Sequence, residues 1–258
     1  MFFASVCGTA CGPPRIVLPA GPGTPAADYA LAFSSASSRC RDVRTFAAEL
    51  ALSGEVGRQK LSGRVLAGFA PGALRIEAPA AIGGPVFILV ADGGRGRLLL
   101  AHDRRLLDDA PPADILDALV GVRLAPDDLR ALLSGCVKAG AEPVRGRAYG
   151  NDWMALDLNG GGDLYLRREA QAGWRVVAGH YSGLDIEYGA SQNGVPSRVQ
   201  IRSTSTTGRG DVQMSVGLSQ VDVNVESDRQ QLVSLIVPPG TLPITLEELR
   251  SSGPLGSH

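Results

Sequence analysis

The chain has 258 residues, 44% of them hydrophobic, and a formal net charge of −1. This length suits one large β-rich domain or two small ones, with enough apolar content for a packed core. The balanced charge argues against nucleic-acid binding, and no stretch approaches the ~20 apolar residues of a membrane-spanning helix. The 4 cysteines show no C-x-x-C spacing and there are only 3 histidines, so neither a metal site nor a cofactor is expected.

Near the N-terminus, small residues lead into a cysteine, in the order Gly8-Thr9-Ala10-Cys11. This order resembles the processing site of a bacterial lipoprotein, so we expect residues 1–10 to be part of a signal peptide and Cys11 to be the lipidation site. Residues 11–25 are rich in proline and glycine, which predicts an extended tether. The segment before Cys11 is short and has no basic residue. Either the natural start lies upstream, or Cys11 is a chance cysteine of a cytosolic protein.

Three segments have the apolar spacing of helices. Residues 26–44 carry a loosely apolar face, and residues 112–120 and 125–133 form two shorter segments with acidic first turns. Pro126 fits the first helical position of the last segment. We therefore predict one N-terminal helix and two short helices in the middle of the chain.

The rest of the chain alternates apolar with polar residues, as half-buried antiparallel strands do. The expected strands lie at residues 45–52, 59–69, 73–78, 86–91, 97–102, 153–158, 163–166, 174–178, 184–188, 199–203, 211–216 and 221–225. The pattern predicts a mainly β (α+β) domain over residues 26–250, followed by a flexible tail at residues 251–258. Its sheet would be strongly curved and antiparallel, with about 11–12 strands and with short helices on the concave face.

Two short helices cannot cover so many strands, so apolar surface should remain for a ligand. Whether the odd or the even residues of a strand face inward stays open, because an error of one residue in the register moves every side chain to the other face. The candidate cavity residues are Leu50, Val65, Leu74, Ile76, Phe87, Leu89, Leu99, Leu164, Leu166, Val176, Ile186, Ile201 and Met214.

Cys40 and Cys136 remain as a pair if Cys7 is removed and Cys11 is acylated. They form a disulfide in an oxidising compartment, or they are two buried thiols. We find no G-x-S-x-G or P-loop motif, and the paired acids fit helix N-termini. No catalytic residue is therefore expected, and an enzyme is the minority interpretation.

Several motifs in this order resemble the LolA/LolB type of lipoprotein carrier and acceptor, in particular the LolB-like outer-membrane lipoproteins. They are the cysteine and tether, Ser53-Gly54 leading to residues 61–65, residues 74–79, 85–89 and 129–136, and the closing residues 243–250. The resemblance implies an incomplete β-barrel whose hydrophobic cavity accepts the acyl chains of lipoproteins. It also implies a lipid anchor on the periplasmic face of the outer membrane, and a periplasmic carrier chaperone as partner.

LolB-like proteins carry a protruding loop with an exposed apolar residue that touches the membrane, and residues 79–85 match it. Ile82 is the only large side chain of this loop, and it is either packed into the core or displayed to the membrane. Two other functions stay open for the same fold. One is a lipid or glycolipid carrier, and the other is an envelope-assembly scaffold whose sheet is filled by its own side chains.

Overall fold

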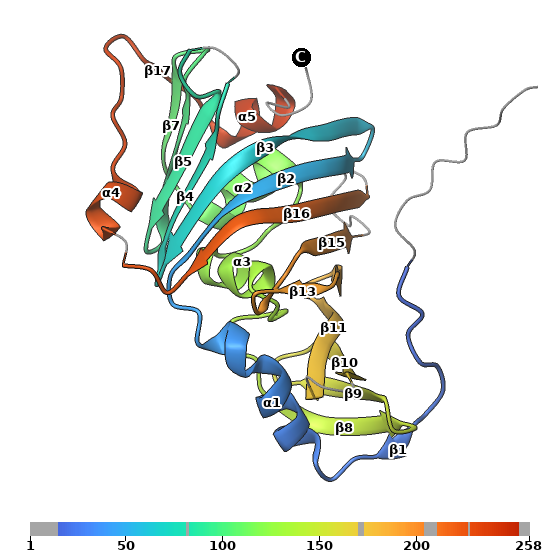
Figure 1. Cartoon of the computed structure of the whole chain (residues 1–258). Coiled ribbons are helices and arrows are strands. Elements are labelled where there is room, and N and C mark those ends of the chain that lie inside the picture. The colour runs from blue at the N-terminus through green and yellow to red at the C-terminus, as the bar shows by residue number, and fades with distance from the viewer. Residues whose placement is uncertain (1–14, 81–82, 170–172, 204–210, 227, 253–258) are drawn as a thin grey trace, which may run out of the picture.

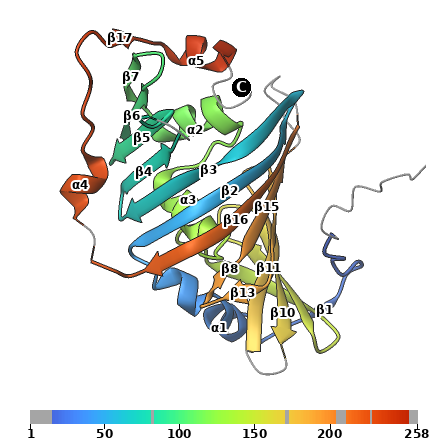
Figure 2. The same ribbon diagram turned by 45° about the horizontal axis from the view of Figure 1, so that its top comes forward.

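One large, strongly curved sheet dominates the molecule (Figures 1 and 2). A computed structural model describes residues 15–80, 83–169, 173–203, 211–226 and 228–252. The sheet has 15 strands and does not close, since its two edge strands are β1 and β17. All neighbours are antiparallel except β7 and β17, which run parallel. The predicted fold, a mainly β incomplete barrel with short helices, is confirmed.

The chain builds the sheet in two successive meanders. The first comprises β2 (Phe46–Val56), β3 (Gln59–Ala70), β4 (Ala73–Ala78), β5 (Phe87–Asp92), β6 (Arg95–Leu100) and β7 (Arg105–Ala110). The second comprises β8 (Pro143–Tyr149), β9 (Trp153–Leu158), β10 (Asp163–Glu169), β11 (Gly173–Tyr181), β12 (Leu184–Tyr188), β15 (Arg198–Ser203) and β16 (Val212–Val223). The long strands β16 and β2 pair with each other and join the two meanders.

The sheet has more strands than the 11–12 expected because β7, β8 and the two-residue edge strands β1 (Thr24–Pro25) and β17 (Leu242–Pro243) were not predicted. The strands expected at residues 211–216 and 221–225 form the single strand β16. Two further two-residue strands are β13 (Ser191–Gln192) and β14 (Val195–Pro196). β13 and β14 form a separate hairpin, while β1 pairs with β8. The last two residues of the expected tether therefore form a sheet edge.

Five helices accompany the sheet in the described part of the chain. They are α1 (Tyr29–Arg41), α2 (Pro112–Val120), α3 (Pro126–Leu133), α4 (Arg229–Val233) and α5 (Leu246–Ser252). α2 and α3 lie within the curve of the sheet, and α1 packs against β8, β10 and β11 (Figure 1). Among the described residues, no helix has the length and apolar character needed to cross a membrane.

The core lies between the inner face of the sheet and these helices. Phe46 and Phe69, paired across β2 and β3, are both almost fully buried and meet edge to face. On the opposite face, Gly68 leaves room for Leu232 of α4, because a methyl group there would lie 2.8 Å from the Leu232 Cδ1 atom. The inner face thus carries the apolar core, and the outer face is partly covered by α4.

A disulfide joins Cys40, near the end of α1, to Cys136, just after α3. Both cysteines are buried, together with Ala131. The bond ties the N-terminal helix to the end of the helix pair across 96 residues of sequence.

Candidate functional site

An apolar cavity of ≈70 Å³ lies between the helix pair α2–α3 and the inner face of the sheet. Every residue that lines it is aliphatic, aromatic or methionine. These residues are Leu50, Leu52, Val65, Ile76, Phe87, Leu89, Leu116, Leu119, Val120, Val122, Leu124, Leu129, Leu133, Ile201, Met214 and Val216. We call this space the acyl cavity. With no titratable group in its wall, it is suited to binding hydrocarbon and not to proton transfer.

Strand register explains how distant residues reach one wall. Leu50 lies opposite Val65, and Ile201 lies opposite Met214, each as a directly paired neighbour on adjacent antiparallel strands. Paired residues point to the same face of a sheet, and residues two apart on one strand do so as well. The alternation in the sequence therefore places a continuous apolar surface under the helices.

The two helices supply the opposite wall through helical spacing. Leu116, Leu119 and Val120 follow the i, i+3, i+4 pattern on α2, and Leu129 and Leu133 lie one turn apart on α3. The sequence predicts both segments as helices from their apolar spacing, but helical spacing alone does not tell which strands a helix covers. The sequence-derived cavity set consequently lacked them.

Gly121 ends α2 and sets its position against the sheet. Its φ of +70° is left-handed, as is common just after a helix. A Cβ there would lie 2.8 Å from Cγ1 of Val56 and 3.1 Å from Cγ2 of Val212. Only glycine therefore fits both the backbone conformation and the close approach of this turn to β2 and β16.

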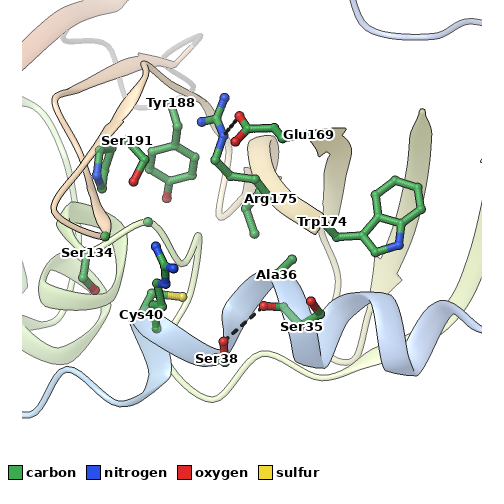
Figure 3. Close-up of a pocket in the computed structure, with 15 residues that line it drawn as sticks. Ser35, Ala36, Ser38, Cys40, Ser134, Glu169, Trp174, Arg175, Tyr188 and Ser191 are labelled. Carbon is green, nitrogen blue, oxygen red and sulfur yellow. Dashed lines mark hydrogen bonds and ion pairs between the residues drawn. The ribbon is translucent and has the colours of Figure 1, made fainter. Parts of the chain in front are cut away.

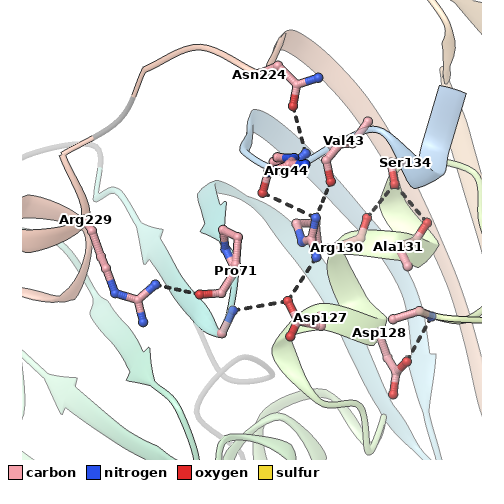
Figure 4. A network of polar contacts seen from close by, with 12 residues as sticks. Val43, Arg44, Pro71, Asp127, Asp128, Arg130, Ala131, Ser134, Asn224 and Arg229 are labelled. Carbon is pink, nitrogen blue, oxygen red and sulfur yellow. Dashed lines mark hydrogen bonds and ion pairs between the residues drawn. The ribbon is translucent and has the colours of Figure 1, made fainter.

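Polar contacts hold α3 at the rim of the cavity (Figure 4). The Arg130 guanidinium donates to the carbonyl oxygens of Val43 and Arg44 and pairs with the Asp127 carboxylate, 3.0 Å away. Asp127 in turn accepts from the Gly72 amide at 3.2 Å, in the turn between β3 and β4. These contacts, which we call the α3 latch, connect the helix to the segment before β2 and to the turn between β3 and β4.

The acyl cavity is too small for a long chain in this arrangement. An engineered protein cavity of about 150 Å³ accommodates benzene, and the space here is about half of that. A chain of many methylenes needs a larger space than this arrangement offers.

Seven of the thirteen candidate cavity residues line the acyl cavity: Leu50, Val65, Ile76, Phe87, Leu89, Ile201 and Met214. Leu74, Leu164, Leu166, Val176 and Ile186 are buried in the same core cluster but do not line the cavity. Leu99 lies between Leu98 and Leu100, which belong to that cluster, and so points to the opposite face of β6. Cys11 and Ile82 lie outside the described residues.

No protein-family model and no curated protein matches the chain. Among solved structures, a DUF1329 family protein from Desulfovibrio piger is 11% identical, with a TM-score of 0.47, over 80% of this chain and 95% of that one. An uncharacterized conserved protein from Thermus thermophilus is 9% identical, with a TM-score of 0.37, over 83% and 96%. Lipoprotein LppX of Mycobacterium tuberculosis is 9% identical, with a TM-score of 0.32, over 77% and 97%. These are distant similarities in both sequence and structure.

Proposed function

We propose that this protein binds acyl chains in the acyl cavity and receives or inserts lipoproteins at the outer membrane. The observation that carries the proposal is the uniformly apolar wall formed jointly by the sheet and the two helices. Each methylene that leaves water gains about 0.8 kcal/mol. A bilayer offers the chain an equally apolar environment, so transfer between protein and membrane would be nearly balanced and controlled by opening.

Opening would occur by movement of the helix pair. α2 and α3 are short, are joined by residues 121–125, and meet the sheet through apolar side chains and the α3 latch. A bound chain would replace the apolar contacts that the helices lose when they lift. The contacts of the α3 latch are therefore the ones that opening breaks and that the bound chain does not replace.

Anchoring and delivery are part of the same proposal. Acylation of Cys11 would hold the domain at the periplasmic face of the outer membrane, and a carrier chaperone would bring the cargo. Stable anchoring takes two membrane signals, so more than one acyl chain is expected. A Cys11→Ala variant, expressed with the natural upstream sequence, should lose both fatty-acid labelling and membrane partitioning; retention of both would refute this anchor.

Delivery would use the loop at residues 79–85. An apolar tip can enter the acyl region, whereas a charged side chain is excluded at a cost of about 2.5–3.5 kcal/mol. Ile82→Glu should leave folding and chain binding intact and slow cargo delivery to liposomes. Unfolding of the variant would identify Ile82 as a core residue, and delivery at the wild-type rate would exclude the loop from insertion.

Binding is tested with a fluorescent 16-carbon fatty acid and a matched pair of helix variants. Leu119 on α2 lines the cavity, while Leu31 on α1 is 76% exposed. An amide buried without a partner costs about 1–3 kcal/mol, so Leu119→Gln should weaken binding by about tenfold or more. Leu31→Gln should bind as the wild type does. Equal affinities of the two variants, with both folded by circular dichroism, would refute the site.

The small volume of the acyl cavity favours a second candidate, an envelope-assembly scaffold filled by its own side chains. Such a scaffold would bind no long-chain probe and would carry no lipid when purified. Mass spectrometry of an organic extract of the purified protein separates the candidates. Recovered lipoprotein, phospholipid or glycolipid supports a carrier and identifies its cargo.

A further inference from the structure

A second pocket, with a largely polar lining, lies between α1 and the sheet and shares no residue with the acyl cavity. Its volume is ≈290 Å³, and its walls come from α1, the end of α3, β10, β11, β12 and the β13–β14 hairpin (Figure 3). We call it the α1 pocket. Its charged lining residues are Arg39, Glu169 and Arg175, which leaves one net positive charge.

The floor of the α1 pocket carries a buried hydroxyl group with no partner. Tyr188, on β12, is only 3% exposed, and its hydroxyl oxygen has no hydrogen-bond partner in the described part of the chain. Figure 3 shows this hydroxyl pointing from the sheet toward α1 and into the pocket. Burial raises the pKa of Tyr188 above its ordinary value, so the group remains a neutral donor at physiological pH. Unpaired buried hydroxyls are rare in native proteins, and a ligand would satisfy this one.

A guanidinium group without an ion pair lies at the rim. Arg39 is exposed, and it has no carboxylate partner among the described residues. A methyl group on Gly194 would lie 3.5 Å from its Cδ atom, so the side chain reaches from α1 to the β13–β14 turn. Arg39 therefore lines the same pocket as Tyr188, one from α1 and the other from β12.

The remaining charges of the α1 pocket are already paired. The Arg175 Nε atom donates to Glu169 at 2.6 Å, and its Nη1 atom donates to the Gly189 carbonyl at 2.9 Å. The Glu169 carboxylate, the one anionic group of the wall, is thus neutralised by its neighbour. The Tyr188 hydroxyl and the Arg39 guanidinium thus line the same pocket without a hydrogen-bond or ion-pair partner among the described residues.

We propose that the α1 pocket binds a phosphate group, with Tyr188 donating to one oxygen at the floor and Arg39 pairing with the charge at the rim. The planar guanidinium is well matched to phosphate oxygens, and a hydroxyl donor to a charged acceptor makes a strong hydrogen bond. A phospholipid headgroup and a free phosphorylated metabolite share this chemistry. The proposal is independent of acyl-chain binding, because the two sites have no residue in common.

Isothermal titration of the full chain tests it with three probes. These are glycerol 3-phosphate, monomeric dihexanoyl phosphatidylglycerol, and glycerol as the uncharged reference. Both phosphate probes should bind with a Kd of about 1 mM or tighter, and glycerol should not bind. Binding of the lipid alone would also support the site and would identify a headgroup as the source of the phosphate.

Three variants locate the binding site. Arg39→Gln should weaken phosphate binding by about tenfold or more and Tyr188→Phe by about fivefold. Arg41→Gln is the control, because Arg41 lies on the same helix, contacts Ser34 and does not line the pocket. It should leave the Kd unchanged.

Several results would overturn the proposal. They are failure of both phosphate probes to bind, equal binding of glycerol, or equal weakening by Arg41→Gln, which would indicate only general attraction to positive charge. Thermal melting of Tyr188→Phe without ligand gives a further criterion. Loss of an unpaired hydroxyl should not lower the Tm; a lower Tm with unchanged phosphate binding would mean that the hydroxyl has a structural role, and would exclude it from the site.

Discussion

Replacing Arg130 by methionine should tighten the binding of a long acyl chain while it destabilises the protein. Arg130 is the centre of the α3 latch, and its side chain is only 17% exposed. Methionine keeps the apolar stem and removes the guanidinium. It also removes the Nε atom, which is buried without a hydrogen-bond partner among the described residues.

The magnitude follows from the contacts that the latch makes. Hydrogen bonds to a charged group contribute about 1.5–3 kcal/mol each. We count only the bonds from Arg130 to the Val43 and Arg44 carbonyls, because the pair with Asp127 lies within α3 and moves with the helix. Removing the buried, unpaired Nε atom offsets part of this loss in the closed state. Lifting α3 should therefore cost about 2 kcal/mol less in Arg130→Met than in the wild type. This raises the population of the open state by about 30-fold, and the apparent Kd falls in proportion while that population is small.

Stopped-flow fluorescence with a 16-carbon probe measures both the association rate and the Kd. The control is Arg97→Met, since the Arg97–Asp108 pair is exposed, lies away from the latch and should contribute under about 1 kcal/mol. We expect faster and tighter binding in Arg130→Met alone, together with a lower Tm. Unchanged or weaker binding would refute the claim that the helix pair must lift before a chain enters.

Three further predictions concern stability. Replacing Cys40 and Cys136 by alanine should lower the free energy of unfolding by about 2–5 kcal/mol in denaturant titrations, as should reduction of the wild type; no change would contradict a stabilising bond. Burial raises the pKa of the Asp163 carboxyl in the folded protein, and the charge of His180 partly offsets this effect. The protonated carboxyl is therefore favoured by folding, and this stabilisation is lost as the pH rises from the unfolded-state pKa through the higher folded-state pKa. Asp163→Asn should therefore raise the Tm more at pH 7 than at pH 4, and equal gains would argue against it. Gly121→Ala should lower the Tm for two reasons: a left-handed φ costs a residue with a Cβ about 1–2 kcal/mol, and the added Cβ would lie too close to Val56 and Val212. An unchanged Tm would show that the turn can relax.

Sequence patterns predicted the fold class because amphipathic alternation is a local property of each strand. The strand expected at residues 86–91 is β5 (Phe87–Asp92), and the helices expected at 112–120 and 125–133 are α2 and α3 within one residue. β7 (Arg105–Ala110) escaped detection because Leu106 and Leu107 are adjacent and so are Asp108 and Asp109, which breaks the alternation. Tertiary pairing with β6 makes this segment a strand.

The candidate site was harder to predict because it depends on register. The β6–β7 pairing shifts between Gly96 and Leu98, and the three consecutive leucines that follow give no parity signal in the sequence. Leu98 and Leu100 consequently face the core while Leu99 does not belong to it. No local sequence pattern predicts the α1 pocket, because Arg39 and Tyr188 are far apart in the sequence and come to line one pocket only when α1 packs on the sheet.

Photocrosslinking with a diazirine-bearing palmitate tests acyl binding most directly, because it reports where the chain lies. The purified full chain would be irradiated with the probe, with and without excess unlabelled palmitate, and the adducts located by peptide mass spectrometry. We predict competed adducts on both walls of the acyl cavity, at the peptides that contain Leu119 and Met214. No competed adduct, or adducts only at exposed apolar residues such as Leu31 and Ile236, would contradict acyl-chain binding in this cavity.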